Sequence, residues 1–522
     1  MNEGSYGTNN GIRNKKSKEN LKQRAYLNSV TSLLDYGSKT ITGFVVTPFL
    51  VTGLGSTLFG VWQMLGQFTS YTGISDIRTT QVLKWTVAKE RDSKDEEELR
   101  EYVTATFVLI LLVMPLMLLG GAVLTWFAPI ITQVDAVYYS TVRITCALLV
   151  MALVTKKAFD PFESVLRGMN LGFKNMGLRA VVFMIGGGLK IAAVLMGYGL
   201  IALASVQVLV MATIGVTLNV IVKKHIPWFG FGKFDFKRAL SFFKLSGWFM
   251  GWTGTKMLLL NTDRVLLGFI AGPVMVTQYV VTKYLINAVR GLIHNVIHGV
   301  LPGMGKLYGN GEFDKLHRVR GHMMLLTWLM VTSIGAVIIL FNESFLTLWV
   351  GEEKYAGATV NILILLSIAQ YIFIQNDGAI INITLDITQM VYMGLVSALI
   401  SIILIFALVP EYGIVGLCTG LIGGRMVMSV GYPWIITKKV GHGIQRPQRF
   451  IRPLLVLIIL WVGSFFLSGY VPSLNWIYLI AAILIVSLLI LIVAYLTGLN
   501  KKQRQEMEAY RQKVKFFKSG VN

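Results

Sequence analysis

Charged side chains are scarce in this chain: Asp, Glu, Lys and Arg make up only 14% of its 522 residues. An ordinary soluble domain carries about 25%. Residues 453–500 contain no charged side chain at all, and this apolar run breaks only at residues 469–475. One membrane-spanning helix needs about 20 apolar residues. The run therefore predicts two spans joined by a turn, and the composition excludes a soluble protein.

Cysteine is nearly absent as well. The two cysteines, Cys146 and Cys418, each lie inside an apolar segment. This usage supports neither a disulfide framework nor a zinc site of the cysteine type. His294 and His298 lie on a predicted span without a nearby Glu, so we expect polar lining there rather than a metal site. We expect no metal and no other cofactor.

Acidic residues are outnumbered, which gives a formal net charge of +22. This balance predicts cytoplasmic loops and not nucleic-acid binding, because 35 of the 48 Lys and Arg residues fall in the tails and alternate loops. The intervening loops hold one cation, Lys354, beside acids such as Glu352 and Glu353. We therefore expect a multi-pass protein of the cell membrane, with both termini in the cytoplasm and lipids around it.

The apolar segments predict an all-α polytopic membrane protein with fourteen transmembrane helices. A β-barrel would instead show weak alternation over about 10 residues per strand. The expected spans are 25–52, 56–83, 102–127, 137–166, 176–197, 199–222, 240–270, 274–304, 321–348, 356–384, 388–410, 413–437, 453–470 and 474–498.

An internal repeat divides these spans into two halves. Tyr198-Gly199 precedes the sixth span and Tyr412-Gly413 precedes the twelfth, while Leu54-Gly55 and Ala271-Gly272 match more weakly. A six-span repeat favours a transporter with its site at the repeat interface. The predicted domains are a basic tail (1–24), an N-lobe (25–222), a linker (223–239), a C-lobe (240–437), an additional hairpin (453–498) and a second basic tail (499–522).

Charges inside the spans are the candidate functional residues, because a charge in a bilayer is costly and usually faces a cavity. Twelve Lys and Arg outnumber five clearly embedded Asp. In the eighth span, Lys283, Asn287, Arg290, His294 and His298 form one helical stripe. A cationic cavity would suit an anionic substrate such as a diphosphate. The predicted substrate-binding residues are Lys39, Arg143, Lys256, Lys283, Arg290 and Arg425.

Three aspartates have two alternative roles. Asp35 stands four residues before Lys39, the favoured order for an ion pair on a helix. Asp263 lies seven residues after Lys256, and Asp377 lies within the tenth span. Each could bind a coupling ion or neutralise a neighbouring cation, so coupling to Na⁺, H⁺ or membrane potential stays open.

Several short motifs along spans one to twelve are built mainly of Gly, Pro and aromatic residues. They comprise Thr47-Pro48, Gly53-Leu54-Gly55, Phe59 to Trp62, Tyr71, Gly73 to Asp76, Asn261 to Arg264 with Gly268, Gln278-Tyr279, Leu301-Pro302 and Lys306 to Tyr308. Together they resemble the Wzx-type polysaccharide flippases of the multidrug/oligosaccharidyl-lipid/polysaccharide (MOP) exporter superfamily.

The resemblance implies two six-helix lobes in a V, similar to the MATE and MurJ transporters. It implies a flippase that moves a polyprenyl-diphosphate-linked oligosaccharide from the cytoplasmic to the outer leaflet by alternating access, for cell-surface polysaccharide biosynthesis. Glycosyltransferases and a polymerase of the same pathway are the implied partners, and the last two spans would hold the lipid tail. The dense arginine pattern of MurJ-type lipid II flippases near the first span is missing.

Two other functions remain alternatives at this point. An ion-coupled exporter of small molecules, of the MATE type, predicts a cavity rich in acids and aromatics, whereas cations are in surplus here. A membrane-embedded polysaccharide polymerase or ligase needs a sizeable outer loop, and the longest one predicted is about ten residues. We therefore expect a transporter and not an enzyme.

Overall fold

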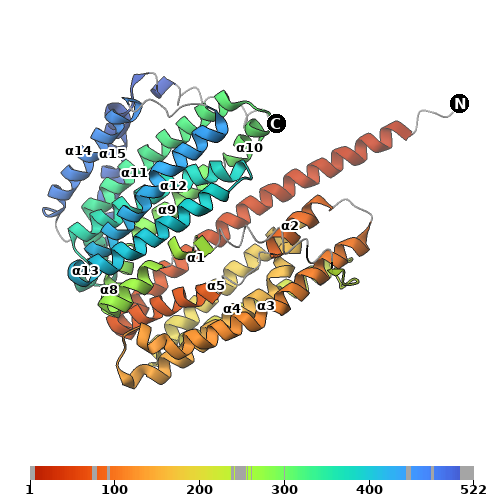
Figure 1. Ribbon diagram of the computed structural model, residues 1–522, viewed down its shortest axis with the longest axis horizontal. Helices are drawn as coiled ribbons and strands as arrows, with labels where there is room; N and C mark the ends of the chain where they lie inside the picture. Colours follow the sequence, from red (N-terminus) through yellow and green to blue (C-terminus); the bar gives the residue numbers. More distant parts are fainter. Residues whose placement is uncertain are drawn as a thin grey trace. The chain divides into compact units, whose positions relative to one another are not determined.

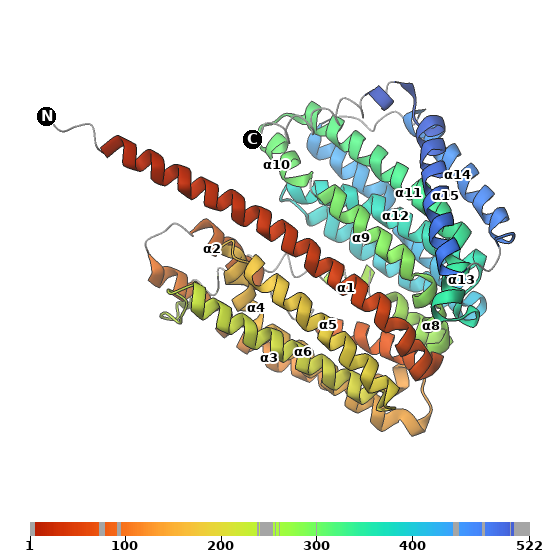
Figure 2. The ribbon, with the colours of Figure 1, turned by 180° about the vertical axis from the view of Figure 1, so that it is seen from behind.

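The computed structural model describes most of the chain, and Figures 1 and 2 show it from two opposite sides. The described residues are 6–72, 79–90, 95–236, 240, 254–255, 257–259, 262–298, 300–441, 448–471, 475–501 and 503–505. The chain divides into two compact units, Met1–Phe269 and Ile270–Asn522. Whether the linker at 223–239 separates two functional lobes stays a prediction.

The first unit is a bundle of long apolar helices in which α4 packs against both α3 and α6, and α1 packs against α5. Helix α3 is capped by Asp95, whose carboxylate accepts the backbone N–H of Glu98. Helix α6 ends in a basic turn, Lys223-Lys224-His225. The elements are α1 (Tyr6–Thr72), α2 (Thr79–Lys89), α3 (Glu96–Ile131), η2 (Ala136–Tyr138), α4 (Tyr139–Gly168), α5 (Phe173–Leu195) and α6 (Gly199–His225).

The second unit is arranged around one central helix, α11. In its most apolar stretch 83% of the residues are buried, whereas 11% are buried in the corresponding stretch of α15. The elements are α8 (Pro273–Thr282), α9 (Tyr284–His298), α10 (Leu301–Gly309), α11 (Phe313–Val350), η3 (Glu352–Lys354), α12 (Ala358–Ile383), α13 (Thr388–Val440), α14 (Gln448–Ser468) and α15 (Trp476–Gly498).

The hairpin α14–α15 is fixed to α11 by two tryptophan–glycine contacts. Trp461 of α14 lies so close to Gly335 that a Cβ there would sit 2.6 Å from its ring, and its indole donates to the carbonyl of Thr332. Trp328 of α11 lies against Gly498 in the same way. These two spans are thus an integral part of the second unit.

The expected all-α membrane architecture is confirmed over the described part of the chain. Ten of its helices are long and apolar enough to cross a membrane. Two of these, α1 and α13, contain a glycine with non-helical dihedral angles, so each comprises two helical segments. The count of fourteen spans stays a prediction, since most of 240–261 lies outside the described residues.

The glycines of the predicted repeat share an unusual backbone conformation. Gly55 and Gly272 have φ/ψ of 72/171° and 85/165°, while Gly199 and Gly413 have φ of 63° and 54°. Glycine adopts a positive φ without the steric cost that other residues have. The two halves of the chain therefore change direction at equivalent positions, and this explains why the repeat in the sequence is a repeat of glycines.

Helix α13 folds back on itself after Gly413 through a row of small residues. Added Cβ atoms at Gly416, Gly420 and Gly424 would meet the backbone of the first half, at Leu408, Ile405 and Ser401, at 2.3–3.0 Å. Small residues four apart let membrane helices approach this closely. The spacing sets the antiparallel register of the hairpin.

Gly424→Ala should destabilise the protein, whereas Gly423→Ala should be tolerated. The Cβ at 424 would clash with the Ser401 backbone, while that at 423 meets only the flexible Leu404 Cδ1. Overpacking of this kind costs about 1–3 kcal/mol. Thermal unfolding in detergent should show a lowered midpoint for Gly424→Ala alone, and equal midpoints for the two variants would contradict this packing.

Candidate functional site

A cavity of about 450 Å³ lies inside the first unit. It is formed by one face of the second segment of α1, by α4 and α6, and by Arg264. Among the described residues, its lining contains two cations, three glutamines and a tryptophan, and no acidic residue. The lining residues are Trp62, Gln63, Gly66, Gln67, Thr69, Leu149, Ala152, Leu153, Lys156, Gln207, Met211 and Arg264.

Helical spacing explains why these side chains converge. On α1, residues 62, 63, 66, 67 and 69 recur every three to four positions, and 149, 152, 153 and 156 do the same on α4. Gly66 has open space where a side chain would start, since a Cβ added there would meet no heavy atom within 4 Å. The sequence thus provides polar groups on two facing helices and leaves room between them.

Arg264 of the lining and Lys190 beside it are held by neutral groups, while the other lining cation, Lys156, interacts electrostatically with Asp160. The Arg264 guanidinium donates to the Gln63 side-chain oxygen at 2.9 Å, and its Nε is buried with no hydrogen-bond partner in the described part of the chain. Lys190 donates to Gln207 at 2.7 Å and lies 5.8 Å from the Trp62 ring centre. A neutral partner leaves the positive charge uncompensated. The cavity can therefore bind an anion, and its amides and indole suit the hydroxyls and apolar faces of a sugar.

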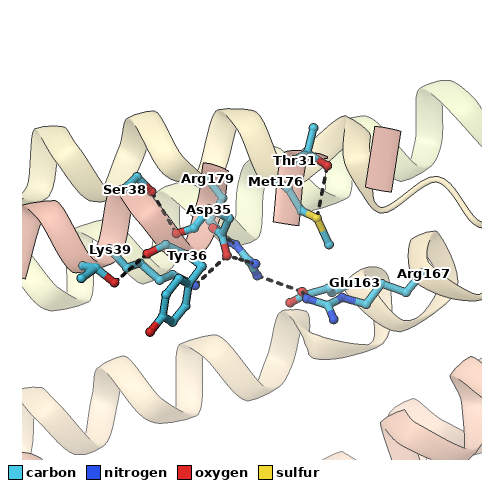
Figure 3. A network of polar contacts seen from close by, with 10 residues as sticks. Thr31, Asp35, Tyr36, Ser38, Lys39, Glu163, Arg167, Met176 and Arg179 are labelled. Atoms are coloured by element: carbon cyan, nitrogen blue, oxygen red, sulfur yellow. Dashed lines mark hydrogen bonds and ion pairs between the residues drawn. The ribbon is translucent and has the colours of Figure 1, made fainter. Parts of the chain in front are cut away.

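A second polar cluster joins α1, α4 and α5 (Figure 3). Arg179 of α5 donates to both carboxylate oxygens of Asp35, at 2.8 and 2.6 Å, and to Glu163 of α4 at 2.9 Å. All three side chains are largely buried. A bidentate pair between planar groups is the strongest ionic contact that side chains form. Arg179 thus ties three helices of the first unit together.

Two further cations flank this cluster at its edges. Lys39 lies 2.9 Å from Asp35, as the i,i+4 spacing predicts, and its side chain is 42% exposed. Arg167 pairs with Glu163 at 2.6 Å. Arg167 also acts on a third cation, Lys84 of α2. Burial lowers the pKa of the Lys84 amine, and the positive charge of Arg167 lowers this pKa further. Because Arg179 contacts both acids, Asp35 and Glu163 are each shared by two cations.

In the second unit, Arg290 and Arg425 approach the same aromatic ring. Their guanidinium carbons lie 5.9 and 5.2 Å from the centre of Tyr371. Arg425 is 5% exposed and donates to the backbone and hydroxyl oxygens of Ser367. Arg290 has no ion pair with an acid of the described chain. Lys283 donates to the Tyr279 hydroxyl at 2.5 Å.

The remaining predicted residues fall in different surroundings. Asp377 forms a bidentate pair with Arg320, at 2.9 and 3.0 Å. Asp263 is 4% exposed and accepts the backbone N–H of Arg264. Arg143 stacks on Trp126 in a separate groove between α3 and α4. Lys256 lies outside the described residues.

Sequence reasoning misses the groups that neutralise the predicted charges. It counts Arg179 and Arg320 among the 35 cytoplasmic cations, because Arg179 stands at the start of the predicted span 176–197 and Arg320 just before the span 321–348, whereas α5 begins at Phe173 and α11 at Phe313. It does not count Glu163 among the embedded acids. The glutamines of the cavity carry no charge, so a search for charged residues does not find them. Gln63 and Gln67, which are four residues apart beside Trp62, form the pattern that could have predicted the cavity.

Arg179→Gln should destabilise the first unit strongly, because it leaves Asp35 and Glu163 buried without their shared cation. Loss of one partner of a buried pair costs about 3–5 kcal/mol. Lys174→Gln, an exposed change on the same helix, is the control. Unfolding in detergent measures both, and adding Asp35→Asn to Arg179→Gln should recover part of the loss. An unchanged midpoint for Arg179→Gln would contradict this role.

Comparisons with known proteins identify the family. The family model described as polysaccharide biosynthesis protein matches residues 27–308, which is more than half of the chain. The putative O-antigen transporter of Shigella flexneri is 23% identical over 74% of this chain and 92% of its own length. EpsK, an uncharacterized membrane protein of Bacillus subtilis, is 22% identical over 59% of this chain, which spans 62% of EpsK.

Solved structures share the fold at low identity. The lipid II flippase MurJ in an inward closed conformation aligns with a TM-score of 0.67 and 10% identity, over 89% of this chain and 97% of MurJ. An inward-facing multidrug resistance MATE transporter of the MOP superfamily aligns at 0.62 and 14%, over 77% and 95%. The expected MurJ/MATE-like fold is thus confirmed. The chain belongs to the polysaccharide biosynthesis protein family.

Proposed function

We propose that this protein is a flippase that moves a polyprenyl-diphosphate-linked oligosaccharide from the cytoplasmic to the outer leaflet of the cell membrane. The observation that carries this proposal is the acid-free cavity of the first unit in a member of the polysaccharide biosynthesis family. Phosphate groups need cations and hydrogen-bond donors, and sugars need amides and an aromatic face. One cavity supplies all of these.

The diphosphate would bind to Arg264 and Lys156, with Lys190 close behind Gln207. Charge-assisted hydrogen bonds to a phosphate contribute about 1.5–3 kcal/mol each. Because Gln63 and Gln207 hold Arg264 and Lys190 without neutralising them, the cations are oriented in advance and keep their charge. Trp62 would stack on the first sugar.

The second unit would contribute a further anion-binding group at Arg290. This side chain lies over the Tyr371 ring and has no acidic partner in the described chain. Its full positive charge would therefore be available to a phosphate. Lys283, which lies over the Tyr279 ring, and Arg425, which lies over the Tyr371 ring, would support anion binding at Arg290. Lys39 would be the peripheral cation of the first unit, because part of its side chain remains exposed.

Alternating access of the two units would carry the polar head across while the polyprenyl tail stays in lipid. Both termini would lie in the cytoplasm. Glycosyltransferases would supply the lipid-linked sugar there, and a polymerase would use it on the outer side. Membrane potential, Na⁺ or H⁺ remain the candidate driving forces. Asp35 is a poor coupling site in this scheme, since Arg179 and Lys39 already neutralise it.

The proposal is tested by flipping of a fluorescent polyprenyl-diphosphate oligosaccharide in proteoliposomes that contain the purified protein. Arg264→Gln should slow flipping at least about tenfold, which corresponds to the loss of one charge-assisted hydrogen bond. Arg290→Ala should reduce it similarly. Lys174→Gln removes the same charge from an exposed position of α5 and should flip at the wild-type rate.

Two results would overturn the proposal. One is wild-type flipping by both Arg264→Gln and Arg290→Ala with unchanged expression, which would remove the anion site. The other is an absence of flipping with several glycan donors, together with uptake of small organic compounds driven by an ion gradient. The second result would assign the protein to ion-coupled export of small molecules.

A further inference from the structure

An apolar groove of about 720 Å³ runs between α3 and α4, apart from the cavity described above. Residues 114–126 of α3 and 143–159 of α4 form its two walls. Its rim is open, because Trp126, Met151 and Leu118 are 62%, 55% and 48% exposed. The lining residues are Met114, Leu118, Gly121, Ala122, Thr125, Trp126, Arg143, Ala147, Val150, Met151, Val154, Thr155, Ala158 and Phe159.

One charge stands in this groove, and it stands near one end. Arg143 is four residues from the start of α4, and Trp126 is five residues from the end of α3, so both lie about 6–8 Å from the connection between the two helices. Trp and Arg near the end of a spanning helix are typical of the membrane interface. The Arg143 guanidinium stacks on Trp126 at 4.3 Å.

Arg143 lacks a counter-charge within the described chain. No acidic residue lines the groove, no ion pair joins Arg143 to a described acid, and its Nε is buried without a hydrogen-bond partner there. A charge in a bilayer is normally paired or satisfied by hydrogen bonds. Since the described residues supply no counter-charge, an anion from outside the protein could provide it.

We propose that the groove binds one anionic phospholipid of the bilayer, with its phosphate on Arg143 and an acyl chain along α3 and α4. The groove extends about 24 Å from Arg143 to Phe159, which is longer than one leaflet of a hydrocarbon core of about 30 Å. A single Arg matches the single charge of a phosphodiester. The diphosphate of a lipid-linked sugar carries more charge and fits the several cations of the other cavity better.

Native mass spectrometry of the protein released from nanodiscs tests this, with phosphatidylglycerol and diacylglycerol, which has no phosphate, as the two probes. The wild type should retain one phosphatidylglycerol in preference to diacylglycerol by at least about tenfold, the effect expected of one charge-assisted contact. Arg143→Gln should abolish the preference. Unfolding midpoints should stay at the wild-type value.

Groove-filling variants separate this site from ordinary annular lipid. Ala147→Trp, one turn from Arg143, should remove the retained lipid while the charge stays in place. Ile144→Trp adds the same ring on α4 outside the groove lining and should retain the lipid. Ala122→Trp, on the α3 wall, provides a second filling variant if Ala147→Trp unfolds.

Three outcomes would overturn the proposal. They are equal retention of the two lipids by the wild type, unchanged retention in Arg143→Gln or in a folded groove-filling variant, and displacement of phosphatidylglycerol by a polyprenyl diphosphate at equal concentration. The last outcome would assign the groove to the transported lipid.

Discussion

Neutralisation of buried charge is the constraint on which the rest of this structure depends. In a low-dielectric bilayer a carboxylate needs a partner at hydrogen-bond distance. Asp35 and Glu163 share Arg179, Asp377 pairs with Arg320, and Asp160 pairs with Lys157 at 3.1 Å. These pairs connect different helices or adjacent turns of one helix. They set the orientation of α1, α4 and α5, which also carry or flank the cavity.

Other cations, for which the described residues offer no acidic partner, are held in a second way, by neutral and aromatic groups. Glutamines hold Arg264 and Lys190, the Tyr371 ring accompanies Arg290, and Trp126 accompanies Arg143. Such contacts stabilise the position of a cation at a modest gain of about 0.5–2 kcal/mol. They leave its charge available. The protein thus separates structural charges, which are paired, from charges that can bind an anion.

The periodicity of apolar residues and the distribution of charge predict the general architecture, because apolar runs and glycines determine the structure of their own segment of the chain. The all-α fold, the bends at Gly55 and Gly413 and the Asp35–Lys39 pair follow from spacing alone. Arg179 and Arg320 could not be recognised as ion-pair partners of the embedded aspartates. The ends of predicted helices are uncertain by a few residues, and each of these arginines lies near such an end. Gln63 and Gln207 are invisible to a search for charges. The role of Arg143 in substrate binding stays a prediction; its place in the groove between α3 and α4 could not be seen in the sequence, because sequence cannot tell which face of a bundle a helix presents.

This separation also distinguishes the two transporter classes that the fold allows. A site for cationic compounds needs a carboxylate that remains unpaired in a cavity. Here the embedded acids Asp35 and Asp377 are each bound by an arginine, and no acid occurs among the described residues that line the cavity of the first unit. Conversion to a cation site would need a new carboxylate in that lining and the loss of Arg264 or Lys156. The charges of the lining, rather than the fold, would therefore distinguish a site for anions from a site for cations.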